Sequence, residues 1–192
     1  IIKPKTSASS RSTGRNLNFK TSLVSLDQLL SLKQLNTDFN DGAKITWNEK
    51  NGTAAFIKFS TSNNKLSKSM LSIDNRKNAA ISFLSKYNNL LKLDNPSVEL
   101  KVVKTDVENS GMTNIRYQQY YHDIKVWGSD LYVHMDPYGN IQSINGRYEA
   151  TPKSLANSTY SVTPEQAIGI SVSDLNYNGR NYSQPKADKI IY

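Results

Sequence analysis

The 192-residue sequence contains no cysteine, only two histidines, and no apolar run near the ~20 residues that cross a bilayer. Without cysteine there are no disulfides and no thiolate chemistry, so a metal would need histidine and carboxylate ligands. His122 and His134 lack the spacing of a His-Glu-x-x-His zinc helix, and no glycine loop for phosphates or dinucleotides is present. A Gly-x-Ser-x-Gly nucleophile elbow is also missing. We therefore expect no catalytic residue and no metal site in this chain.

Acidic residues are the scarcer charge, with 16 against 24 lysines and arginines, which leaves a net charge of +8. Such a charge suits nucleic acid, an anionic cell wall or an acidic protein. The basic residues are spread along the chain and form no stripe with stacking aromatics, so we expect no nucleic-acid partner. A solvated, lysine-rich surface is the simplest interpretation.

The first 20 residues hold five basic and no acidic side chains among serine, threonine and glycine, which predicts a flexible basic tail. The chain starts with Ile1-Ile2 in place of methionine. A removed signal peptide would explain this start, so we expect a secreted protein.

A short helix is predicted where leucines recur at helical spacing, with Asp27 in its first turn and a stop at 36–42. These leucines are Leu23, Leu26, Leu29, Leu30 and Leu32. A β-hairpin follows at 43–47 and 53–60, because the two runs bracket Asn51-Gly52, which tolerates positive φ. Trp47, Phe56 and Ile57 are its candidate core residues.

A longer helix is predicted from Asp74, its expected N-cap, to the stop at 94–96. Apolar residues keep helical spacing through it, at Ala79, Ala80, Phe83, Leu84, Tyr87, Leu90 and Leu91. Strands are predicted at 98–107, 113–121, 125–135 and 141–148, separated by turn-forming residues. The fold class is therefore α+β: a helix packed on a curled antiparallel sheet, a cystatin-like arrangement, with the hairpin before it. We assign residues 21–152 to this N-terminal lobe.

Residues 153–192 are predicted to form a second, smaller αβ lobe. Thr163, Pro164 and Gln166 supply an N-cap, a first-turn proline and a capping box for a helix that ends near Leu175. Residues 188–192 have strand character with no partner strand in view. We expect the lobe to be incomplete and the natural chain to continue beyond Tyr192, and an open strand edge could support a homodimer.

The strand at 113–121 has an unusually polar and aromatic centre, Arg116-Tyr117-Gln118-Gln119-Tyr120. Alternation places Tyr117 and Gln119 on one face of the sheet, and Arg116, Gln118 and Tyr120 on the other. Two interpretations stay open. These side chains form a polar ladder across strands, or they recognise a partner protein, since tyrosine and arginine often anchor interfaces.

The remaining polar residues of this region have structural explanations. His134 lies within a predicted strand, where we expect a neighbouring backbone group to satisfy it, and His122 is expected in an exposed turn. Asp123 and Asp136 are read as turn formers. Gly128 inside a strand predicts a bulge or a close backbone approach. The carboxylates of Asp106, Glu108, Asp130 and Glu149 are expected to be isolated on surface faces.

A set of ordered positions resembles the propeptide of thermolysin-type zinc metalloproteases, the fungalysin/thermolysin propeptide motif. These positions are Phe83-Leu84, Leu90, Asp106, Gly111, residues 116–120, Val126-Trp127-Gly128-Ser129, Val133-His134, Gly139 and Asn145-Gly146. Residues 162–167 resemble the start of a PepSY-type lobe, so the resemblance spans roughly 44–192. Asn114 stands where the family often has histidine, and Lys125 replaces the usual proline.

The resemblance implies that this segment acts on a partner domain and does not itself catalyse a reaction. The family's propeptides act as intramolecular chaperone and inhibitor of the catalytic domain in a secreted precursor, until autocatalytic cleavage. Zinc and calcium would belong to that catalytic domain. Partner-interface candidates are Arg116, Tyr117, Gln118, Gln119, Tyr120 and Trp127, and structural candidates are Gly111, Gly128, His134, Gly139 and Gly146. The alternative is a stand-alone PepSY-like binding module at the cell envelope, with its basic tail on anionic wall polymer.

Overall fold

A six-stranded antiparallel sheet forms the centre of the computed structural model, which describes residues 24–40, 42–60, 70–155, 159, 161–175 and 185–192. The strand order is β1–β2–β6–β5–β4–β3, and a short seventh strand, β7, joins β5. The strands are β1 (Ala43–Trp47), β2 (Ala54–Phe59), β3 (Leu100–Val107), β4 (Thr113–Tyr121), β5 (Ile124–Met135), β6 (Ile141–Arg147) and β7 (Ile190–Ile191). The α+β class is thus confirmed, while the predicted basic tail lies outside the described residues.

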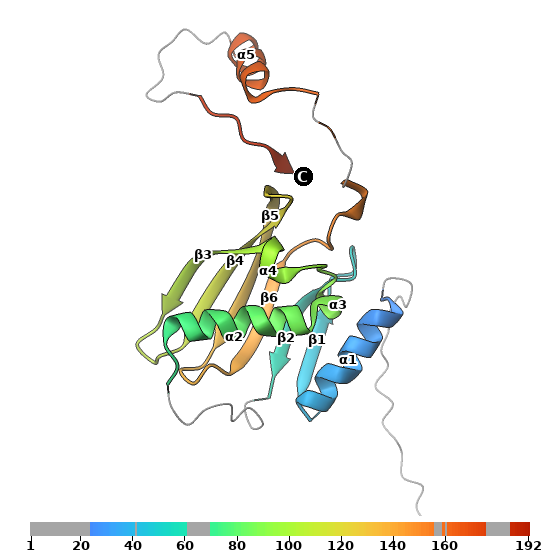
Figure 1. Cartoon of the computed structure of the whole chain (residues 1–192), viewed down its shortest axis with the longest axis vertical. Coiled ribbons are helices and arrows are strands. Elements are labelled where there is room, and N and C mark those ends of the chain that lie inside the picture. The colour runs from blue at the N-terminus through green and yellow to red at the C-terminus, as the bar shows by residue number, and fades with distance from the viewer. Residues whose placement is uncertain (1–23, 41, 61–69, 156–158, 160, 176–184) are drawn as a thin grey trace, which may run out of the picture.

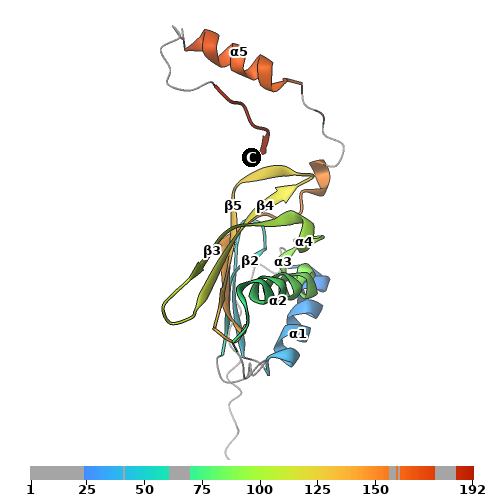
Figure 2. The ribbon, with the colours of Figure 1, turned by 60° about the vertical axis from the view of Figure 1, so that its left-hand side comes forward.

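Helices cover one face of this sheet and leave the other face uncovered (Figures 1 and 2). The covering helices are α1 (Leu26–Asp38), α2 (Ile73–Lys86), α3 (Asn88–Leu91) and α4 (Pro96–Glu99). Between the two layers lies one apolar cluster, to which α2 contributes Ala80 and Leu84 and the sheet contributes Ile57, Ile115 and Val133 among others. The hydrophobic effect of this burial holds the layers together.

The predicted first helix is confirmed as α1, and it begins with a reciprocal cap. The Ser25 hydroxyl accepts from the Gln28 backbone N–H, and the Gln28 side chain accepts from the Ser25 N–H. Gln28 is fully buried, and its Nε2 also donates to the carbonyls of Gly52 at 2.8 Å and Leu90 at 3.2 Å. A single side chain therefore caps α1 and fastens it to the β1–β2 turn and to α3.

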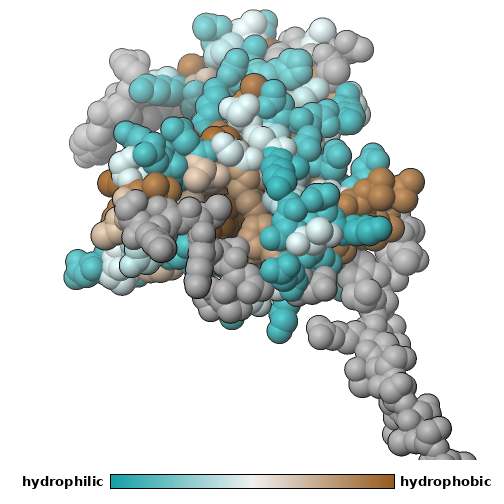
Figure 3. All heavy atoms as spheres, turned by 60° about the horizontal axis from the view of Figure 1, so that its bottom comes forward, coloured by the Kyte–Doolittle hydropathy of each residue, from teal (hydrophilic) through white to brown (hydrophobic). Residues whose placement is uncertain are grey.

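The outer side of α1 is apolar and exposed. Leu26, Leu29 and Leu30 are 70%, 51% and 57% exposed, and Figure 3 shows hydrophobic side chains gathered at this side of the molecule.

The predicted long helix is present as α2, but its two ends differ from those predicted. Its N-cap is Ser72, whose hydroxyl accepts from the Asn75 N–H, and Asp74 lies in the first turn, so the expected Asp74 cap is wrong. The helix breaks at Tyr87, where φ is −109° and ψ 29°, and continues as the short α3. Val98 also lies in the short helix α4, so the predicted strand 98–107 begins at Leu100.

The hairpin β1–β2 and the meander β4–β5–β6 are confirmed with strand bounds close to those predicted. Ile57 is fully buried and Trp47 packs against the core, as expected. Phe56 is 38% exposed because it faces away from the helices, so its assignment to the core is wrong.

The predicted C-terminal helix is confirmed as α5 (Pro164–Asp174), with the capping box of Thr163 and Gln166. The expectation that the terminal strand has no partner is wrong. β7 pairs in parallel with β5, with Ile190 opposite Lys125 and Ile191 opposite Val126. It pairs beside the tip of the β4–β5 hairpin, beyond the end of β6, where β5 has no other described neighbour on that side.

Candidate partner-binding surface

The uncovered face of the sheet carries a row of side chains that lie directly opposite one another on neighbouring strands. Arg116 on β4 faces Tyr132 on β5, which faces Asn145 on β6, which faces Phe56 on β2. Residues opposite each other in an antiparallel pair share a face. Since Phe56 and Arg116 are partly exposed, this row presents aromatic rings beside a cation, with no helix over them.

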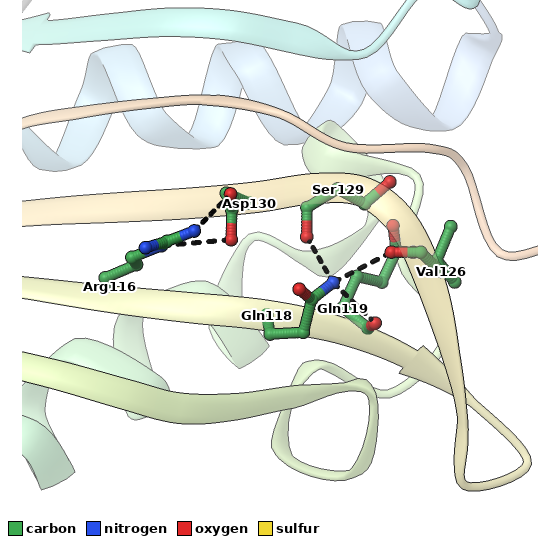
Figure 4. Close-up of polar contacts among 6 residues, drawn as sticks. All are labelled: Arg116, Gln118, Gln119, Val126, Ser129 and Asp130. Atoms are coloured by element: carbon green, nitrogen blue, oxygen red, sulfur yellow. Dashed lines mark hydrogen bonds and ion pairs between the residues drawn. The ribbon is translucent and has the colours of Figure 1, made fainter. Parts of the chain in front are cut away.

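Arg116 is held in place by a two-pronged ion pair with Asp130 (Figure 4). Its Nε donates to Oδ1 at 3.1 Å and a terminal nitrogen donates to Oδ2 at 2.8 Å. The carboxylate raises the pKa of the guanidinium, whose carbon also lies 5.8 Å from the centre of the Tyr132 ring. The expectation of an isolated Asp130 is therefore wrong. The pair fixes a planar cation at the surface, the geometry that protein interfaces often use.

A large bulge in β5 lies next to this pair. Gln118 faces Asp130 and Tyr120 faces Lys125, so residues 126–129 of β5 lie opposite Gln119 alone. Gly128 adopts φ +68° in this bulge, a conformation that disfavours side chains, although a Cβ there would meet no atom within 4 Å. Its backbone conformation, and not lack of space, therefore favours glycine.

The buried side chain of Gln118 fills the bulge. Its Nε2 lies 2.8 Å from the carbonyls of Val126 and Ser129 and 3.2 Å from that of Gln119 (Figure 4). Residues 126–129 have no individual pairing partners on β4, and the Gln118 amide supplies hydrogen-bond donors to carbonyls at this point. The buried Gln118 amide therefore stabilises the conformation of residues 126–129, which form a protrusion on the surface.

The protrusion presents Trp127 to solvent. Its side chain is 58% exposed, and Lys125 Nζ lies 5.5 Å from the ring centre. An open cavity of about 660 Å³ lies beside it, lined among others by Arg147, Glu149, Ile191 and Tyr192. An exposed tryptophan on a fixed loop beside a hollow is a typical anchor for a protein partner.

Tyr117 and Gln119 point to the other side of the sheet and are buried within the chain. The Gln119 amide donates to the Glu149 carbonyl at 2.9 Å and accepts from the Glu149 N–H at 3.0 Å, so it ties the chain after β6 to β4. Tyr117 is 1% exposed, and its hydroxyl has no hydrogen-bond partner among the described residues. Burial raises the pKa of this phenol.

Tyr120 lies at the margin of the open face. Lys101 Nζ sits 4.5 Å from its ring centre and 2.7 Å from Asp123 Oδ1, and this contact lowers the pKa of Asp123. Asp123 and His122 form the two-residue turn between β4 and β5, both with positive φ, and both are exposed. Such turns match the twist of a hairpin.

His134 bridges side chains on the two neighbouring strands, and not a backbone group as predicted. Its Nδ1 lies 2.6 Å from Asn114 Oδ1, and its Nε2 lies 2.6 Å from Asn145 Oδ1. Asn114 in turn donates to Glu108 at 2.9 Å, so Glu108 is not isolated. Among the described residues, no three histidine or acidic side chains lie close enough to hold a metal ion.

The other carboxylates expected to be isolated also have partners. Asp106 pairs with Lys104 at 2.9 Å, and Glu149 accepts from Asn51 at 2.9 Å.

The remaining glycines allow close packing. Gly146 on β6 passes so near β5 that a Cβ would lie 2.3 Å from the Asp130 carbonyl oxygen. Gly111 lies in the β3–β4 turn against Pro137, and Gly139 lies in the β5–β6 turn against Leu71. Both turns therefore pack tightly at the same end of the sheet.

The structure thus separates the sequence candidates into two groups. Tyr117, Gln118 and Gln119 are buried and engaged within the fold, whereas Arg116, Tyr120 and Trp127 reach the surface. Sequence reasoning missed Asp130, Tyr132 and Phe56, because the strand register that brings them beside Arg116 comes from the fold. These exposed groups together form the candidate surface.

Comparison with known proteins identifies the same region. Residues 98–148, from α4 through β6, match the family model of the Fungalysin/Thermolysin Propeptide Motif. Two curated relatives, the bacillolysins of Bacillus subtilis subsp. amylosacchariticus and of Bacillus subtilis strain 168, are each 29% identical over 109 residues. The aligned region covers 57% of this chain and 20% of each relative. No solved structure matches the chain.

The resemblance to thermolysin-type propeptides is confirmed by these matches. The matched motif contains β4, β5 and β6, which carry most of the candidate surface, whereas Phe56 lies outside it on β2. The PepSY-type lobe stays a prediction.

Proposed function

We propose that this chain is the propeptide of a secreted thermolysin-like zinc metalloendopeptidase, and that it assists folding of the catalytic domain and inhibits it until autoproteolytic removal. The observation that carries the proposal is the propeptide motif over residues 98–148. The motif spans β3 to β6, where hydrogen bonds of polar side chains fix the position of Arg116 and the shape of the bulge in β5.

The physical basis of this role is mass action. A folded segment that binds only the native catalytic domain stabilises that domain, and covalent linkage raises its effective concentration to about the millimolar range. The net charge of +8 would steer it toward an acidic protease surface. The zinc and calcium ions would be held by the catalytic domain.

We assign the contact with the catalytic domain to the exposed candidates. Arg116, Tyr132 and Phe56 supply a flat surface with a fixed cation, and Trp127 supplies a protruding anchor. Among the described residues, no helix is long and apolar enough to span a membrane. Thermolysin-type propeptides belong to secreted proteases, which is the basis of the proposed location.

Refolding tests the chaperone role. The denatured catalytic domain of the same precursor is diluted into buffer with or without the separately purified chain, and recovered peptidase activity is measured after the chain has been digested. The proposal expects a dose-dependent rise in recovered activity. An equal yield with the chain and with an unrelated basic protein of the same charge would contradict it.

Sequencing the gene beyond Tyr192 tests the precursor assignment. A zinc-protease sequence in the same reading frame is the expected result. A stop codon or a cell-wall anchor in its place would favour the envelope-binding module.

A further inference from the structure

Strand β3 forms one edge of the sheet, and its outer side pairs with no strand in the described part of the chain. It is 8 residues long, which makes it a longer edge than β1 with 5. A free edge exposes unpaired backbone N–H and C=O groups that can accept another strand. Val102, Val103 and Val107 on this edge are 43%, 50% and 47% exposed, an unusual amount of aliphatic surface for an unpaired strand.

Pairing with β4 fixes which side each residue of β3 faces. Four residues of β3 lie on the side of the sheet that the helices cover, because the β4 residues opposite them are buried on that side. They are Leu100, Val102, Thr105 and Val107. Three face the open side, opposite Gln118, Arg116 and Asn114: Lys101, Lys104 and Asp106. Val103 is the extra residue where the register shifts.

This arrangement is self-complementary about a twofold axis between Val103 and Lys104. In antiparallel pairing with a second copy, Leu100 lies opposite Val107, Lys101 opposite Asp106, and Val102 opposite Thr105. Each pair joins side chains of the same face, and the two Lys101–Asp106 pairs join opposite charges. If the second copy is shifted by one residue along β3, helix-side residues lie opposite open-side residues and the faces no longer match. If it is shifted by two residues in one direction, Lys101 lies opposite Lys104, which places like charges together.

We propose that two copies of this chain associate through antiparallel pairing of β3, in the register that places Lys101 opposite Asp106 of the second copy. The axis is perpendicular to the sheet, so the two sheets become one and both helical layers lie on the same face. The exposed valines of β3 are then covered by aliphatic atoms of the second copy. This inference does not depend on the proposed protease partner.

The contact is short and each copy carries a charge of +8, so the dimer is weak. We expect a dissociation constant of roughly micromolar order, with tighter association as salt screens the repulsion between the two copies.

Sedimentation velocity over a concentration series tests the proposal with a charge swap. Lys101→Asp and Asp106→Lys each set like charges opposite one another twice in the dimer, so each variant alone is expected to dimerise at least tenfold more weakly. The double variant Lys101→Asp/Asp106→Lys restores opposite charges and dimerisation. An equimolar mixture of the two single variants is expected to form a heterodimer, because its two copies carry complementary pairs.

The variants leave the fold intact, since the side chains of Lys101 and Asp106 are 48% and 52% exposed and their present ion pairs, with Asp123 and Lys104, lie on the surface. Circular dichroism checks this. The proposal is overturned if the wild-type chain stays monomeric throughout the series, if the single variants dimerise as the wild type does, or if the mixture fails to associate.

Discussion

At the scale of single residues, Trp127 is the side chain whose exposure the fold maintains most specifically. Gln118 holds the carbonyls on both sides of it, and Gly128 supplies the positive φ that the bulge needs. A large apolar ring kept at the surface by buried hydrogen bonds is costly without a partner to cover it. Its contribution should therefore appear in binding and not in stability.

Trp127→Ala is expected to weaken inhibition of the catalytic domain about tenfold or more, the range of an interface anchor, with the unfolding midpoint nearly unchanged. The inhibition constant and a urea titration measure the two effects. Tyr138→Ala is the matched control, because Tyr138 is an exposed aromatic in the β5–β6 turn at the opposite end of the sheet. Equal loss in both variants would show that Trp127 has no special role.

Asp38 gives a second residue-scale prediction, in the dependence of stability on pH. Its carboxylate accepts from Lys86 at 2.6 Å, from the Tyr87 hydroxyl and from Gln34 at 2.7 Å, and these contacts lower its pKa to about 2. A carboxyl whose pKa is lower in the folded state stabilises the fold above its unfolded pKa of about 4, and this contribution is lost as the pH falls toward 2.

Asp38→Asn should therefore lower the free energy of unfolding by about 1–2 kcal/mol at pH 7. Between pH 5 and pH 2, the free energy of unfolding should fall less for the variant than for the wild type. Urea unfolding at a series of pH values measures this difference. Parallel pH profiles for the wild type and the variant would contradict it. Asp74→Asn is a suitable control, since Asp74 is exposed and its ion pair with Lys77, at 3.3 Å, lies on the surface.

At the scale of elements, α1 depends on Gln28 for its place on the fold. Removing that side chain leaves the carbonyls of Gly52 and Leu90 and the N–H of Ser25 without this partner, two of them at buried positions. Gln28→Ala should therefore cost about 2–3 kcal/mol of unfolding free energy and speed hydrogen exchange in α1 before it does so in β4 or β5. Exchange measured by mass spectrometry follows each element.

Gln34→Ala is the control on the same helix, because Gln34 is exposed and its side chain donates a surface hydrogen bond to Asp38. If both variants exchange alike, the buried anchor does not hold α1.

The elements also show how far the sequence predicts this fold. Apolar spacing, the Asn51-Gly52 turn and the capping box at Thr163 are local signals, and each element they predict is present. Ser72 and Asp74 are both residue types preferred at an N-cap, so residue type alone does not choose between them. Hydrophobic spacing continues through Tyr87, so it does not predict the break there. Pairing of β7 with β5 joins residues more than 60 positions apart, so no local pattern predicts it.

The candidate surface shows the same division. Residue type alone makes Arg116, Gln118, Gln119, Tyr120 and Trp127 candidates for the surface. Gln118 and Gln119 are nevertheless buried. Gln118 is buried because its amide bonds to carbonyls of the bulge at 126–129, and Gln119 is buried because it lies on the helix side, where it bonds to Glu149. Asp130 could not be recognised as the partner of Arg116 before the register of β4 and β5 was known.

At the scale of the whole molecule, the chain combines a helical layer, an uncovered sheet face with aromatic and cationic side chains, and a protruding tryptophan. Many of the described side chains shape this surface, among them Arg116, Gln118 and Asp130. This organisation suits a protein that acts by binding another folded domain, as the propeptide motif over β3–β6 implies.

The most direct measurement of that claim is a titration of the catalytic domain of the same precursor with the purified chain, recording initial rates of peptide hydrolysis before the chain is cleaved. We expect saturable inhibition of one catalytic domain by one chain, weakened by Trp127→Ala and unaffected by Tyr138→Ala. Full peptidase activity at a large molar excess of the intact chain would contradict it.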